Sequence, residues 1–124
     1  MNEGKTTKKT NAVIDSALVT EEVLYIYKDE DDKESGIETG TYPNGNMVKR
    51  FKISGDRIVV VRELKGFDMM RIDDVVSKSK EEYMPVFFHF AVKIDGLQVP
   101  IEDFANFKGK DFNKIKIQVL SLNF

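Results

Sequence analysis

The sequence predicts one α+β domain, with a small antiparallel β-sheet followed by three to four α-helices. Apolar and polar residues alternate before Gly66, whereas apolar residues recur at helical intervals after it. Strands and helices do not alternate along the chain, which argues against a doubly wound parallel sheet. A chain of 124 residues is of the usual size for one domain with one hydrophobic core.

The composition excludes several classes of site and partner. The chain has no cysteine, which removes disulfides, thiolate nucleophiles and thiolate zinc sites and favours a reducing compartment. The net charge is -2 and the basic residues are scattered, so nucleic acid is a poor partner. No apolar run approaches the roughly 20 residues that span a bilayer. We therefore expect a soluble protein that binds neither nucleic acid nor membrane.

The chain divides into an arm and a domain. Residues 1–12, MNEGKTTKKTNA, are basic and polar and lack the apolar core of a secretory signal. Blocks of like charge are usually solvated, so we expect a disordered arm. Residues 13–124 are expected to form the single α+β domain, with its helical part at about 67–124.

Before the main hairpin, the pattern predicts an extra strand, a loop and a turn. Residues 23–28, VLYIYK, are rich in β-branched and aromatic residues, which favour strands. The acidic stretch at 29–40 is typical of a solvated loop, and its spacing lacks the glycine and glutamate that a calcium-binding EF-hand loop requires. In residues 42–45, Tyr-Pro-Asn-Gly, proline presets φ and the next two residues tolerate positive φ, so the chain should reverse there.

A β-hairpin is predicted at about residues 46–64, with a turn at residues 54–56, Ser-Gly-Asp. The second strand, RIVVVREL, has three successive valines and therefore should lie centrally in the sheet. The first strand alternates, and only one of its faces is expected to be apolar. We place on that face Met47, Phe51 and Ile53, and on the other face Val48, Arg50 and Lys52.

Two successive helices are predicted after Gly66. The first begins near Asp68, which can act as its N-cap, and its apolar residues at helical intervals are Met69, Ile72, Val75 and Val76. The second begins at about residues 81–82, because Pro85 is tolerated only in a first turn. It is apolar on most of its circumference, which is typical of a buried helix, and it should end at residues 95–96, Asp-Gly.

A short helix and a terminal segment complete the chain. Pro100 should open the short helix, and Gly109 should close it with a positive φ. In the terminal segment, helical spacing and strand alternation are both present. The helical set is Phe112, Ile115, Val119 and Leu122, and the alternating set is Ile115, Ile117 and Val119. Asp111 is a plausible N-cap, which favours a helix.

The motifs of common enzymes and metal sites are missing from the sequence. It contains no P-loop, no dinucleotide-binding glycine pattern and no nucleophile elbow. His89 is the only histidine and lies within an apolar helix, where packing is the simpler role. The paired acids at 73–74 and 81–82 should be surface charges, because adjacent helical residues do not face each other. We expect a non-enzymatic protein without a metal or cofactor.

From about Phe51 to the C-terminus, the sequence resembles the small tail assembly chaperones of tailed bacteriophages and prophages. The resemblance rests on an ordered series of short motifs: VVVRELKGFDMMRID at 59–73, KIDGLQV at 93–99, IEDFANF at 101–107 and KDFNKIKIQVL at 110–120. In that family, a strand leads through glycine to an aspartate at the head of a helix. The second helix ends in an Ile-Asp-Gly turn, and Asp-Phe opens the terminal helix. The resemblance therefore also favours a terminal helix here.

The resemblance implies a binding role in the cytoplasm of a bacterial host. Such chaperones keep the long, apolar and helical tape measure protein soluble while the tail tube polymerises around it. The tail tube protein and a second copy of the chain are further candidate partners. A structural tail protein retained in the virion, either a tube or a completion protein, is the alternative.

Methionine and phenylalanine residues are the candidates for partner contact. Methionine adapts to irregular apolar surfaces, and it clusters here on two successive predicted helices, although packing within the core is the simpler role for each residue. Because they cluster there, the residues expected to form the partner-binding surface are Met69, Met70, Met84, Phe87 and Phe88.

Overall fold

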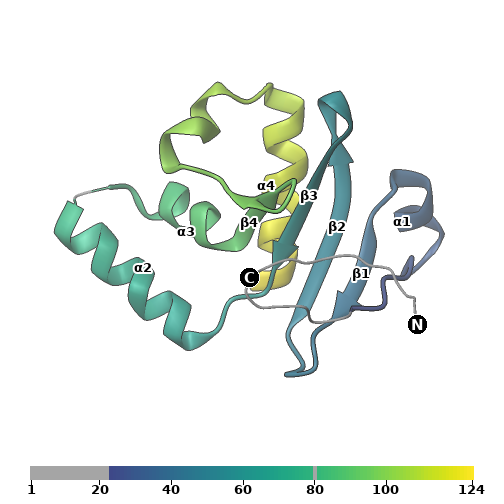
Figure 1. The fold of residues 1–124 in the computed structure, drawn as a ribbon, viewed down its shortest axis with the longest axis horizontal. Coiled ribbons are helices and arrows are strands. Elements are labelled where there is room, and N and C mark those ends of the chain that lie inside the picture. Colours follow the sequence, from purple (N-terminus) through teal and green to yellow (C-terminus); the bar gives the residue numbers. More distant parts are fainter. Residues whose placement is uncertain (1–22, 80) are drawn as a thin grey trace.

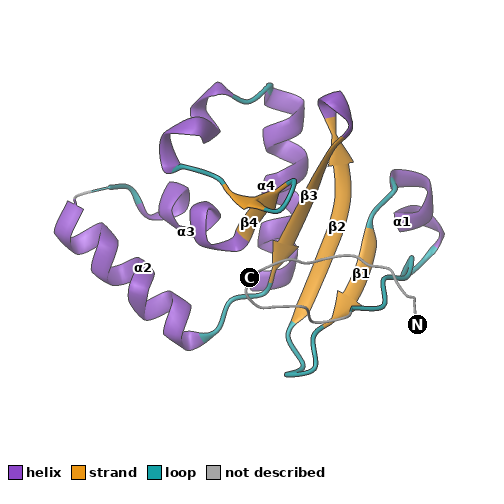
Figure 2. Cartoon of the chain, in the orientation of Figure 1, coloured by secondary structure: helices purple, strands orange, loops and turns teal. Residues whose placement is uncertain are grey.

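The computed structural model describes residues 23–79 and 81–124. The predicted arm at 1–12 and the first ten residues of the predicted domain lie outside this part of the chain. Five antiparallel strands form one sheet in the order β1-β2-β3-β4-β5, with helices beside it, so the predicted α+β class is confirmed (Figures 1 and 2). In chain order, the elements are α1 (Glu30–Ser35), β1 (Glu38–Thr41), β2 (Met47–Ile53), the 3₁₀ turn η1 (Ser54–Asp56), β3 (Arg57–Arg62), α2 (Gly66–Ser79), α3 (Tyr83–Ala91), β4 (Val92–Ile94), β5 (Leu97–Gln98), the 3₁₀ helix η2 (Ile101–Asn106) and α4 (Gly109–Asn123).

Both predicted chain reversals are confirmed. β2 pairs with β3 along six residues, and η1 turns the chain with positive φ at Gly55 and Asp56. The turn at 42–45 joins β1 to β2, where the Tyr42 amide donates to the Asn46 carbonyl at 2.8 Å. The short-range turn chemistry therefore sets the order of the first three strands.

The predicted faces of β2 are partly wrong. Met47 is exposed, whereas Val48 on the opposite face is fully buried. The face of β2 that packs against α4 also holds Lys49, which is buried. Its Nζ donates to Gln118 Oε1 and Ser121 Oγ of α4, each at 3.0 Å. Burial lowers the pKa of Lys49, and the Asp32 carboxylate partly opposes this change.

The segment before β1 differs from the prediction. Residues 23–28 form no strand and pair with β1 only through the Ile26–Thr39 bridge. The predicted acidic loop contains α1, whose N-cap is Asp29 and whose C-cap is Gly36 with a φ of 74°, and it also contains most of β1. α1 forms because Asp29 caps its first turn, and β1 forms because it pairs with β2. These interactions outweigh the tendency of an acidic run to remain a loop.

The segment at 83–98 is only partly the predicted helix. Pro85 lies in the first turn of α3 as expected, but α3 ends at Ala91. The next residues form β4 and β5, joined by Asp95 and Gly96 with φ values of 52° and 84°. Asp-Gly with two positive φ values is the preferred two-residue hairpin turn, and pairing of β4 with β3 completes the sheet.

The terminal segment is a helix, as predicted, but its start differs. Gly109 begins α4 and does not close the preceding helix. Asp111 lies inside α4 and is not the N-cap. Its buried carboxylate accepts hydrogen bonds from the amide and hydroxyl of Ser54 at 3.2 and 3.1 Å, and Arg57 Nη2 lies 3.8 Å away. The side chain therefore ties α4 to the β2–β3 turn.

One core lies between the sheet and the helices. α4 packs across β2 and β3, and α3 packs against β4 and η2. Figure 1 shows α2 extending away from the sheet on the side opposite α1. The buried apolar residues of this core are Ile37, Phe51, Ile53, Val59, Val61, Ile72, Val86, Phe87, Phe88, Ala91, Val92, Val99, Phe104, Ile115 and Val119.

Replacing Asp111 with alanine should lower the free energy of unfolding by about 1–3 kcal/mol at neutral pH, because two buried hydrogen bonds are lost. Urea denaturation measures the change. The matched control is Asp103→Ala, an exposed acid in η2, which should have little effect.

The contribution of Asp111 should also depend on pH. Burial raises the pKa of Asp111, but the hydrogen bonds from Ser54 and the charges of Arg57 and Lys110 lower it by more. The pKa of Asp111 is therefore below its usual value. A carboxyl whose pKa is lower in the folded state than in the unfolded state stabilises the fold. This contribution is complete when the pH is above the unfolded pKa of about 3.9, and it is lost as the pH falls through the folded pKa. The stability difference between wild type and Asp111→Ala should therefore shrink in acid. A constant difference would contradict this role.

A candidate partner-binding surface on α2

The structure divides the five predicted contact residues into three groups. Phe87 and Phe88 are buried in the core and cannot belong to an exposed surface, which corrects that part of the prediction. Met69 is half-buried against the core. Met70 is 70% exposed and Met84 is 37% exposed. Phe87 and Phe88 are buried because β4, η2 and α2 cover most of the short helix α3.

Met70 and Met84 do not form one patch. The guanidinium of Arg71, beside Met70, lies 5.4 Å from the ring centre of Phe90, near the end of α3. Met84 lies six residues earlier on α3, roughly 9 Å along the helix axis. The two methionines therefore lie toward opposite ends of the α2–α3 pair.

The structure instead brings Met70 together with Phe67. These residues are three positions apart on α2, so their side chains share one face of the helix. Phe67 is 67% exposed, and Arg71 lies 5.8 Å from its ring centre. Sequence reasoning missed Phe67, although its spacing from Met70 was an available signal. We call Phe67 and Met70 the α2 face.

The packing of α2 leaves this face uncovered. Among its residues, only Ile72 is fully buried, and the helix packs chiefly against α3. Asp73 and Asp74 are exposed, as predicted, and Asp74 pairs with Lys78 at 3.3 Å. α2 is therefore a peripheral helix with charged and apolar residues on its outer side.

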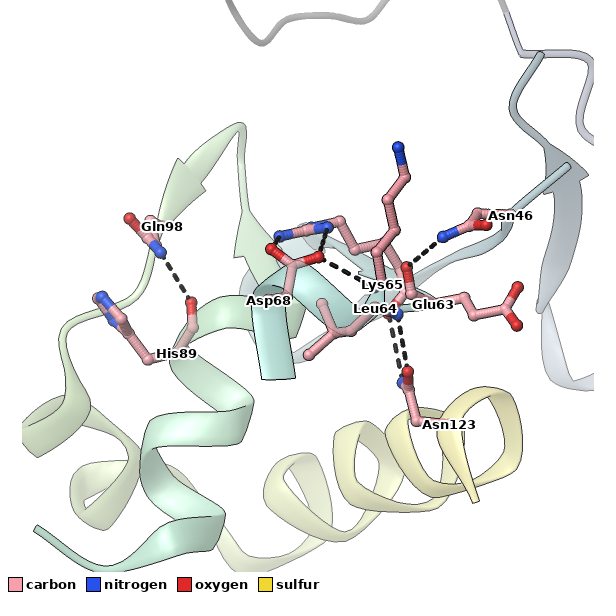
Figure 3. A network of polar contacts seen from close by, with 9 residues as sticks. Asn46, Glu63, Leu64, Lys65, Asp68, His89, Gln98 and Asn123 are labelled. Carbon is pink, nitrogen blue, oxygen red and sulfur yellow. Dashed lines mark hydrogen bonds and ion pairs between the residues drawn. The ribbon is translucent and has the colours of Figure 1, made fainter. Parts of the chain in front are cut away.

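A polar junction fixes the direction in which α2 leaves β3 (Figure 3). Arg62, the last residue of β3, donates to both carboxylate oxygens of Asp68 at 3.3 and 3.4 Å. Asp68 Oδ2 also accepts from the Lys65 amide at 3.0 Å, just before the helix begins. Asp68 therefore lies inside the first turn of α2 and is not the predicted N-cap, but its carboxylate accepts from the amide that precedes the helix and joins α2 to the strand.

Two further elements meet at the same junction (Figure 3). Asn123, at the end of α4, accepts from the Leu64 amide at 2.8 Å and donates to the Arg62 carbonyl at 3.3 Å. Asn46, before β2, donates to the Glu63 carbonyl at 3.3 Å. The connection between β3 and α2 is thus hydrogen-bonded both to the end of α4 and to the residue before β2.

The electrostatics of Asp68 suit this structural role. Burial raises its pKa, but hydrogen bonds from the Lys65 amide and Arg62, together with the charges of Arg62 and Arg71, produce a net decrease. The carboxylate therefore stays ionised at neutral pH and can accept the hydrogen bonds from Arg62 and Lys65.

The described residues show no arrangement typical of metal chemistry. Within 23–79 and 81–124, no group of three or more His, Asp and Glu residues lies close enough to hold a metal ion. His89 is half-buried, and its Nδ1 is hydrogen-bonded to the Val99 carbonyl. In the same part of the chain, no helix is long and apolar enough to cross a membrane.

Replacing Asp68 with alanine should lower the free energy of unfolding by about 1–2 kcal/mol, because the first turn of α2 loses its hydrogen bonds with Arg62 and the Lys65 amide. Urea denaturation measures this change. Amide exchange should also accelerate in the first turn of α2 and much less in β2. Asp73→Ala, on the exposed side of the same helix, is the matched control, and an equal loss in both variants would contradict this role.

Comparison with known proteins gives no neighbour from which a role can be transferred. The chain matches no family model, no curated protein and no solved structure. The geometry of α2 and the order of the sequence motifs are therefore the observations that bear on function.

Proposed function

We propose that this protein is a tail assembly chaperone of a bacteriophage or prophage, which binds the tape measure protein and keeps it soluble while the tail tube assembles. Its site of action is the cytoplasm of the bacterial host. It acts by binding and not by catalysis, with the tail tube protein as a further partner. The observation that carries the proposal is the exposed α2 face, Phe67 and Met70, on a helix that packs chiefly against α3.

The motif that resembles the family supports the proposal through its position. The stretch at 59–73 holds the end of β3, the junction residues Arg62 and Asp68, and both residues of the α2 face. Arg62 and Asp68 fix the start of α2, and Phe67 and Met70 are exposed on its outer side, whereas Val59, Val61 and Ile72 of the same stretch are buried. The same short segment therefore positions a helix and supplies its contact residues.

The chemistry of the α2 face suits an apolar helical partner. Large exposed apolar side chains are candidates for a helix-in-groove or helix-on-helix contact. Burying one such side chain stabilises a complex by about 1.5–3 kcal/mol before the entropic cost of association. A face of two such residues gives a weak contact. Weak contacts repeated along a rod hold it collectively and release it stepwise, as assembly around a tape measure requires.

Co-expression with a tape measure fragment tests the proposal. Phe67→Asp and Met70→Asp should each reduce the soluble fraction of the fragment, because a buried contact would then carry an unpaired charge. Met84→Asp should have a smaller effect, since Met84 lies toward the other end of the helix pair. The matched control is Leu97→Asp, an exposed apolar residue of the short edge strand β5, which should leave solubility unchanged.

Two results would contradict this function. One is equal solubility of the fragment with wild type, Phe67→Asp and Met70→Asp while each chaperone variant stays folded. The other is the presence of the protein in purified virions by mass spectrometry, which would favour a structural tube or completion protein. An assembly chaperone should be absent from the finished particle.

A further inference from the structure

The described part of the chain begins above one face of the sheet. Ile26 lies at the sheet edge, where its backbone exchanges two hydrogen bonds with Thr39, of 2.9 and 2.7 Å. Two residues earlier, the Leu24 carbonyl oxygen lies 3.2 Å from the position that a Cβ on Gly40 would occupy, and a methyl group of Val23 fills that position. Traced toward the N-terminus, the backbone therefore leaves the edge after Ile26 and crosses over β1, where only glycine leaves room for it.

The crossing takes place on the face of the sheet opposite α4, which we call the open face. Gly40 pairs with Val48 of β2, one residue before Lys49, whose side chain points to α4, and successive side chains of a strand point to opposite faces. In Figure 1, α4 lies behind β2 and β3, so the open face is turned toward the viewer. The guanidinium carbon of Arg50 on β2 lies 3.9 Å from the centre of the Tyr25 ring, and burial raises the pKa of Tyr25 to about 12. The crossing thus already reaches from β1 onto β2.

This crossing covers only part of the open face. Val48 is fully buried, although it lies outside the main core. Farther along the same face, Ile58 is 41% exposed and Val60 is half-buried. Lys52, which pairs with Ile58 across β2 and β3, is exposed. An apolar strip therefore continues from the covered Val48 toward the β2–β3 turn, where the described residues leave it open.

The open face carries an excess of positive charge. Salt bridges pair Arg50 with Glu38 at 2.9 Å and Arg62 with Asp68 of α2 at 3.3 Å. Even with Asp68 counted, the bases outnumber the acids by four to two. The charged residues that the strands place on this face are Glu38, Arg50, Lys52, Arg62 and Lys93. A segment with apolar and acidic side chains would complement this surface.

The residues that directly precede the crossing have this composition. Residues 13–22, VIDSALVTEE, contain five aliphatic residues and three acids but no base. Ile58 lies two strands and four residues beyond Gly40, roughly 10 Å across the strands and 14 Å along them, whereas ten extended residues reach roughly 33 Å. The segment is tethered to this face at Val23, so its effective concentration there is in the millimolar range. Length, charge and tether therefore select this segment over a separate molecule.

We propose that residues 13–22 dock on the open face of the sheet in their own chain. Their aliphatic side chains cover Ile58 and Val60, and their carboxylates lie among the basic residues of the face. The sheet then has a layer on each side, with α4 on one face and this segment on the other. The contact uses no residue of the α2 face and does not depend on the proposed function.

Cysteine cross-linking of the full chain tests the proposal, because the chain has no cysteine of its own. Leu18→Cys with Ile58→Cys should form a disulfide within one chain when oxidised at about 5 µM, far below the effective concentration of the tethered segment. The matched control is Leu18→Cys with Ile117→Cys, an exposed aliphatic residue of α4. The control pair should cross-link at least about tenfold more slowly, since α4 lies on the opposite side of the sheet.

The register of the segment is tested by moving the first cysteine to Ala17 or Val19. At least one of the three positions should cross-link faster to residue 58 than to residue 117. Equal rates for both partners at all three positions would overturn the proposal. Disulfides that form only between two copies of the chain would also overturn it.

Gly40→Ala tests the crossing itself. A Cβ at this position would meet the Val23 side chain and the Leu24 backbone, so the crossing should be displaced and cross-linking of residues 18 and 58 should slow severalfold. Gly66→Ala is the matched control, because a Cβ there meets nothing within 4 Å. A folded Gly40→Ala chain that cross-links at the original rate would count against the proposed path.

A double-mutant cycle tests the contact without cross-linking. Leu18→Asp and Ile58→Asp should each lower the urea midpoint, and the double variant should lower it by less than the sum, because both substitutions remove the same contact. Leu18→Asp combined with Ile117→Asp should give an additive change. Additivity in both pairs would argue against docking of the segment on the open face.

Discussion

The rest of the structure depends on how the chain passes from the sheet into its helices, at the junction of β3 and α2. Asp68 binds Arg62 and the Lys65 amide, and Asn123 binds the backbone on both sides of Glu63. These contacts hold the end of the central strand, the first turn of α2 and the last turn of α4 at one point. The core holds the inner side of α2 through the buried Ile72 and the partly buried Met69, Val75 and Val76, and the polar contacts fix where the helix starts.

Local patterns predicted the parts of the fold that local chemistry decides. The β2–β3 hairpin and α2 follow from turn residues and periodicity within a few positions. Tertiary pairing decided the others: residues 23–28 have strand composition but share only one bridge with β1. The Asp95–Gly96 turn carried the signal for a hairpin, yet the apolar run before it favoured a continuing helix. For the candidate site, Met70 lies outside the apolar stripe of its helix, which was a signal for its exposure. Phe87 is buried because α2, η2 and β4 cover most of α3, and these tertiary contacts are not visible in the sequence.

Lys49 shows that the apolar face of β2, which also holds Phe51 and Ile53, includes a buried charged residue. Its ammonium is buried between β2 and α4, and the partners that it contacts are the neutral side chains of Gln118 and Ser121. Burying a charge without a bonded carboxylate is unfavourable, as its lowered pKa indicates. The hydrogen bonds can form in one register of α4 against the sheet, so this lysine contributes to the uniqueness of the packing more than to its strength.

The attachment of α2 at one end has a consequence for how its outer face can be used. The helix has 14 residues and is roughly 21 Å long, and the polar junction holds only its first turn. Beyond that turn, the contacts with α3 supply most of its support, so local opening should begin at the far end and leave the sheet intact. Small tilts of α2 would then let its outer face contact side chains of different sizes along a long partner. The free-energy cost of such a tilt is well below that of unfolding the domain.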